Sequence, residues 1–86
     1  MPEISRFLGI VVAMYYRDHT PPHFHVKYGE HRASITVETL EVLEGNIPSR
    51  VLALVLEWVH LHRKELSEDW QLAMEKKPLK KIEPLV

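Results

Sequence analysis

Two apolar-rich segments in the first part of the chain have the residue types that are typical of β-strands. Residues 4–8 and 10–17 are rich in the β-branched and aromatic residues that strands favour, and Gly9 between them predicts a bulge or bend. The second segment is apolar at every position except its last, so we expect it to lie inside the sheet. Pro21 and Pro22 then interrupt the pattern and predict a stiff, extended arm.

The clearest pattern is a hairpin formed by residues 23–28 and 31–37. Gly29 and Glu30 suit a two-residue type II′ turn, which pairs residue 28 with residue 31 and fixes all earlier pairs. In this register the polar side chains share one face, as the cross-strand pairs His23–Thr36, His25–Ser34 and Lys27–Arg32. A slip of one residue would bury that polar set, so we expect the register to be firm. His31 falls on the opposite, core-side face.

From Pro48 onward the apolar period changes to that of a helix, which we predict over residues 47–75. Its apolar surface is wider than one sheet face can cover, since three large residues lie off the main stripe: Leu54, Trp58 and Leu61. Three explanations stay open. The helix breaks near Ser67 and folds back, a partner chain binds these three residues, or the C-terminal tail wraps over them.

These elements predict a single small domain of the α+β class over residues 1–86. An antiparallel sheet of about four strands packs on one long C-terminal helix. Residues 1–46 are mainly β, with a further short edge strand at residues 40–44, residues 47–75 are helical, and residues 76–86 form an extended basic tail.

Composition excludes several classes of protein. The chain has no cysteine, which rules out a disulfide framework and a cysteine-rich zinc knuckle. Its apolar runs fall far short of the roughly 20 residues that span a bilayer, and its start does not resemble a signal peptide, so we expect a cytoplasmic protein without a membrane partner. The net charge of −1 disfavours a generally basic nucleic-acid binder but leaves room for a local cationic face.

The histidines carry the candidate chemistry, because four of the six lie within residues 19–31. One hypothesis is a metal-independent ribonuclease that needs no cofactor. His23 and His25 would exchange protons with the substrate, and Asp18 or His19 would orient them. Three further residues would bind the RNA substrate, with two cations on the phosphate and one aromatic ring stacked on a base: Lys27, Arg32 and Tyr15.

A second hypothesis is a metal site. Two histidines at alternate positions of a strand point the same way, and a third on the arm completes a set of three imidazoles: His19, His23 and His25. Such a set suits a divalent transition metal such as zinc, with Asp18 as a supporting partner or a ligand. The remaining alternative is that these histidines are ordinary exposed strand residues.

Several segments resemble the signature of a bacterial family catalogued as domain of unknown function 4160. The most distinctive is residues 18–25, Asp-His-Thr-Pro-Pro-His-Phe-His, followed by residues 54–58, Trp70 and residues 81–85. The resemblance implies a bacterial origin. The resemblance also implies a two-gene module, in which the second gene encodes a member of another small family, domain of unknown function 2442. Such a module suggests a toxin–antitoxin pair.

Together with the polar strand face, this resemblance leads us to expect a toxin-like component that acts on RNA. Its partner would be a small antitoxin-like protein or a second copy of the chain. The alternatives are a metal-binding protein and a non-catalytic protein–protein interaction module, whose interface would be Leu54, Trp58 and Leu61.

Overall fold

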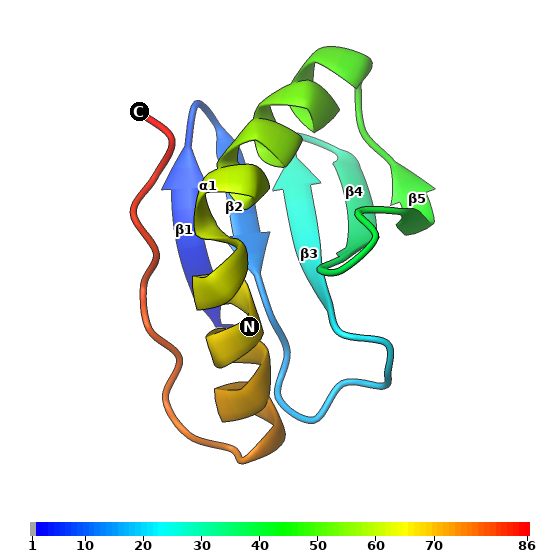
Figure 1. The fold of residues 1–86 in the computed structure, drawn as a ribbon. Helices are drawn as coiled ribbons and strands as arrows, with labels where there is room; N and C mark the ends of the chain where they lie inside the picture. The colour runs from blue at the N-terminus through cyan, green and yellow to red at the C-terminus, as the bar shows by residue number, and fades with distance from the viewer. Residues whose placement is uncertain (1) are drawn as a thin grey trace.

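A computed structural model describes residues 2–86, which form an antiparallel sheet with a long helix across one face (Figure 1). The elements are β1 (Glu3–Phe7), β2 (Ile10–Ala13), β3 (His23–Tyr28), β4 (His31–Thr36), β5 (Val42–Asn46) and α1 (Ser49–Met74). Each strand pairs with its sequence neighbours, so the order in the sheet is β1-β2-β3-β4-β5. The predicted α+β class is confirmed, and the fifth strand is the short edge strand expected near residues 40–44. Within residues 2–86, no helix is long and apolar enough to cross a membrane.

The connection between β1 and β2 differs from the prediction. Leu8 and Gly9 both have positive φ, 51° and 79°, and Phe7 pairs with Ile10, so they form a two-residue type I′ turn. Gly9 is therefore part of a hairpin turn and not a bulge. Strand β2 also ends at Ala13, earlier than predicted, because the chain leaves the sheet there to form the proline-containing arm.

The predicted register of the β3–β4 hairpin is confirmed. Tyr28 pairs with His31, and every earlier pair follows in step to His23 with Thr36. Gly29 has a φ of 59°, as the first central residue of a type II′ turn requires. The apolar side chains of the hairpin are buried beneath α1: Phe24, Val26, Ala33 and Ile35. His31 is exposed, although the register places it on the core-side face.

The long helix does not break near Ser67. It runs from Ser49 to Met74 as two helical segments joined by a kink at His62, whose backbone is non-helical (φ −128°, ψ 24°), and its direction changes partway along (Figure 1). Its buried residues recur at helical spacing on the side that faces the sheet: Val51, Val55, Trp58, Val59, Leu66, Trp70 and Ala73. The helix therefore supplies one half of the core and the sheet supplies the other.

The C-terminal tail covers part of the excess apolar surface of the helix, at Trp58. Residues 75–86 run back beside β1 (Figure 1). The backbone N–H of Ile82 donates to the Ile4 carbonyl at 2.8 Å, and the indole N–H of Trp58 donates to the Glu83 carbonyl at 2.8 Å. Trp58 has no exposed surface, so it is unavailable as an interface residue. Leu54 is partly buried, whereas Leu61 is 64% exposed.

The tail is also held at the far end of the helix. One carboxylate oxygen of Asp69 accepts a hydrogen bond from the backbone N–H of Lys80 at 2.9 Å. Burial raises the pKa of Asp69, against the opposing effect of this hydrogen bond and of the Lys80 charge. The basic side chains of the tail point to solvent, at Lys76, Lys77, Lys80 and Lys81.

Candidate functional site

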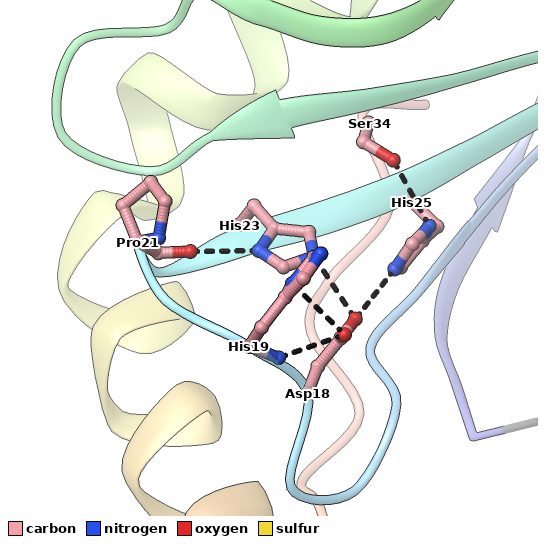
Figure 2. A network of polar contacts seen from close by, with 6 residues as sticks. All are labelled: Asp18, His19, Pro21, His23, His25 and Ser34. Carbon is pink, nitrogen blue, oxygen red and sulfur yellow. Dashed lines mark hydrogen bonds and ion pairs between the residues drawn. The ribbon is translucent and has the colours of Figure 1, made fainter.

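The side chain of Asp18, on the arm, forms hydrogen bonds with two histidines of β3 (Figure 2). One of its carboxylate oxygens, Oδ2, accepts a hydrogen bond from His23 Nε2 at 2.9 Å and another from His25 Nε2 at 3.0 Å. Its other oxygen, Oδ1, accepts one from the backbone N–H of His19 at 2.9 Å. The two histidines are brought to one carboxylate because residues at alternate positions of a strand project from the same face.

The second nitrogen of each ring is held as well. His23 Nδ1 lies 2.7 Å from the Pro21 carbonyl oxygen, and His25 Nδ1 lies 3.2 Å from the Ser34 hydroxyl on β4. The His23 ring also packs against the indole of Trp70 on α1, with 5.3 Å between ring centroids. Both imidazoles are therefore fixed in orientation before any ligand arrives.

These partners limit where the protons can lie, because carbonyl and carboxylate oxygens only accept hydrogen bonds. The carbonyl of Pro21 and the carboxylate of Asp18 are both acceptors, so His23 makes both bonds when both of its nitrogens carry a proton. His25 makes both of its bonds in the neutral form, with the proton on Nε2 and the Ser34 hydroxyl as donor. Two protonated Nε2 atoms thus converge on one oxygen atom.

Asp18 is an anion in this arrangement. Burial, the largest single effect, acts to raise the pKa of its carboxyl. Hydrogen bonds from His25 and from the His19 backbone, together with the charge and hydrogen bond of His23, outweigh it, so the pKa lies below its ordinary value. The site is therefore a carboxylate held between two imidazoles.

The predicted catalytic residues differ in how much of each side chain is exposed to solvent. The side chain of His23 is 1% exposed, against 26% for His25, 20% for Asp18 and 76% for His19. His23 is enclosed by the arm and by Trp70, so it cannot touch a substrate. The predicted acid–base pair of His23 and His25 therefore does not fit this geometry, and His25 is the strand histidine within reach of solvent.

The metal-ligand set also differs from the predicted one. In the described part of the chain, Asp18, His23 and His25 each offer a ligand atom, and these atoms all lie within 4.8 Å of one another. His19 lies at the rim, with its Nδ1 3.3 Å from Asp18 Oδ1 and its ring centroid 5.2 Å from that of His23. Asp18 thus takes the place that the sequence analysis assigned to His19.

A cleft of about 350 Å³ lies beside this cluster, on the sheet face opposite α1. The three predicted substrate-binding residues all line it, together with His25 and Ser34: Tyr15, Lys27 and Arg32. The Tyr15 ring meets the His25 ring edge-on, with centroids 4.3 Å apart. Sequence reasoning did not place Ser34, Glu44 or Trp70 at the site, although the hairpin register already placed Ser34 opposite His25.

The sequence matches a known protein family. The sequence model of a family described as "Domain of unknown function (DUF4160)" matches residues 9–71. The matched segment contains the arm, the β3–β4 hairpin and most of α1, and therefore every residue of the cluster. No curated protein and no solved structure matches the chain.

Proposed function

The chain belongs to the DUF4160 family, and we propose that it binds a divalent transition metal through Asp18, His23 and His25. The observation that carries this proposal is the convergence of two imidazole nitrogens and one carboxylate oxygen, at 2.9 and 3.0 Å. Ligands about 2.0–2.1 Å from a zinc ion are separated by roughly 2.9–3.4 Å, depending on the angle between them. The cluster therefore needs little movement to accept an ion. The His23 Nε2 proton would be released, and His25 would carry its single proton on Nδ1 instead of Nε2.

The outer hydrogen bonds support a metal as well. A metal-bound histidine usually donates its other N–H to a carbonyl, hydroxyl or carboxylate, which fixes the tautomer. With a metal on both Nε2 atoms, His23 Nδ1–H donates to the Pro21 carbonyl and His25 Nδ1–H donates to the Ser34 hydroxyl. Every polar atom of both rings then has a partner, with each imidazole neutral.

Three protein ligands leave a coordination position for water or substrate. A catalytic zinc ion with three protein ligands lowers the pKa of its bound water to about 7. Asp18 and His25 are partly exposed, which gives such a position access to solvent. This supports metal-assisted hydrolysis over proton exchange by two histidines, since His23 is buried.

Metal titration tests the proposal. We expect untagged, chelator-treated protein to bind about one equivalent of Zn²⁺ in calorimetry, and to give a Co²⁺ absorption spectrum of low coordination number. Asp18→Ala and His25→Ala should weaken binding at least 100-fold, because each removes a ligand. Ser34→Ala should weaken it by about 10-fold, because it removes an outer hydrogen bond.

His60→Ala is the matched control, because His60 is exposed on α1 and lies outside the cluster. It should bind Zn²⁺ like the wild type. Binding well below one equivalent, or equal losses in His60→Ala and His25→Ala, would contradict the proposal. Circular dichroism of each variant establishes that it has folded.

For the cellular role, we propose a toxin-like component of a bacterial toxin–antitoxin module, acting on RNA in the cytoplasm. Two cations on the cleft wall beside His25 favour an anionic target of this kind. Induced expression should arrest growth, and His25→Ala should restore it because the variant lacks a residue of the site. Viable counts after induction measure both effects, with His60→Ala as the control. Normal growth with the wild-type chain would exclude this role.

A further inference from the structure

Two cations face each other on the open side of the sheet. Lys27 on β3 and Arg32 on β4 are direct cross-strand partners, a placement in which like charges destabilise a sheet. Within residues 2–86, neither side chain has an ion-pair partner. Among the other Lys and Arg side chains of residues 2–86, three form ion pairs, at Arg6, Lys77 and Lys81. The Lys27–Arg32 pair is thus a like-charge repulsion within the sheet. An anionic ligand bound between the two side chains would relieve this repulsion.

The pair belongs to the cleft that also contains His25. Lys27 and Arg32 line its wall, and Tyr15 lines it on the side of His25. One carboxylate, Glu44, lines the cleft too, and within residues 2–86 it forms no ion pair with Arg32. Gly45 on β5 completes the lining. A Cβ atom at this position would clash with the Arg32 carbonyl oxygen, so glycine allows β5 to approach β4 here.

We propose that this cleft binds the phosphodiester backbone of single-stranded RNA and presents one phosphate to the cluster at His25. The inference rests on the proposed metal centre and names its substrate class. The planar guanidinium of Arg32 suits two phosphate oxygens, and the Lys27 ammonium adds a second positive charge. Tyr15 offers an aromatic edge and face on which an unpaired base stacks. A double helix fits less well, because its bases are already stacked on one another.

The charges of the chain and of the cleft indicate how many RNA phosphates the protein neutralises. With a net charge of −1 and two cations in the cleft, the protein should neutralise about two phosphates. For single strands the slope of log affinity against log salt is about −0.7 per phosphate, so we expect a slope of about −1.4. Removing either cation should bring it to about −0.7.

Fluorescence anisotropy with a labelled eight-nucleotide single-stranded RNA tests this inference. We expect Lys27→Ala and Arg32→Ala each to weaken binding by about 10-fold and to halve the salt slope. Lys64→Ala is the control, because Lys64 is exposed on α1, across the sheet from the cleft. Since each cleft variant also relieves a like-charge contact, its melting temperature should equal or exceed that of the wild type. Lost binding then cannot be attributed to unfolding.

Competition and metal removal separate the outcomes. A nucleoside monophosphate that competes as well as the oligonucleotide overturns an RNA site, because it shows that a single phosphate suffices. If Lys64→Ala weakens RNA binding as much as Arg32→Ala does, the cleft is not the RNA-binding site. If chelator-treated protein still binds RNA and the protein does not bind one equivalent of Zn²⁺, the cleft is supported and only the metal centre is refuted. Stoichiometric Zn²⁺ binding, together with RNA binding that is unchanged in Lys27→Ala and Arg32→Ala, supports the metal centre and refutes the cleft.

Discussion

Replacing Trp58 by alanine is expected to lower the free energy of unfolding by about 3–5 kcal/mol, the usual cost of truncating a fully buried aromatic side chain. Trp58 has no exposed surface, and its ring packs 5.6 Å from that of Phe7 and 6.5 Å from that of Phe24. Domains typically have about 5–15 kcal/mol of stability in total. Urea denaturation of chelator-treated protein measures the change.

Two matched variants show what Trp58 contributes. Trp58→Phe keeps most of the packing but removes the hydrogen bond to the Glu83 carbonyl. It should therefore lower the free energy of unfolding by less than Trp58→Ala does. Leu61→Ala lies on the same helix but at an exposed position, and should change stability by less than about 0.5 kcal/mol. A Trp58→Ala protein as stable as Leu61→Ala would mean that the tail does not cover this part of the helix in solution.

Replacing Asp18 by asparagine is expected to cost about 1–3 kcal/mol in metal-free protein. The carboxylate accepts N–H groups from both His23 and His25, and the side-chain amide has no negative charge to offer them. Because His23 is buried, its N–H group cannot turn to water when this acceptor is weakened. Denaturation at pH 7 in the presence of chelator measures this loss, with Glu57→Gln as an exposed control.

The effect of Asp18 should also depend on pH. Its pKa is lower in the folded protein than its ordinary value, so its stabilising contribution is fully present above that ordinary value, about 3.9. The contribution is lost as the pH falls through the lower, folded-state pKa. The difference between wild type and Asp18→Asn should therefore shrink as the pH falls below about 4. A difference that stays constant as the pH falls below this value would mean that Asp18 is not the charged partner of the two histidines.

The hairpin was the most predictable part of the fold, for a local reason. A two-residue turn at Gly29 fixes the pairing of all following residues, and apolar and polar positions alternate along residues 23–28 and 32–36. Turn geometry and burial therefore demand the same register. By contrast, Leu8 and Gly9 form a tight turn that the pattern did not indicate, because leucine rarely adopts a positive φ.

The burial of His23 could not be predicted from the strand pattern. The register correctly placed His23 on the polar face, but the arm and the Trp70 ring from α1 cover it there. Neither contact follows from strand periodicity, because both depend on how distant segments fold back. The same limitation applies to Trp58, whose cover is a short tail with no periodic pattern of its own.

Asp18, His23 and His25 lie within eight consecutive residues, so the site is almost entirely a property of one short peptide segment. Bringing its ends together requires closing a very short loop, which costs little entropy compared with sites built from distant parts of a chain. Such a segment is a suitable module for transplantation. Grafted into another antiparallel hairpin with a serine opposite the second histidine, it would carry the three ligand groups and both outer hydrogen bonds with it.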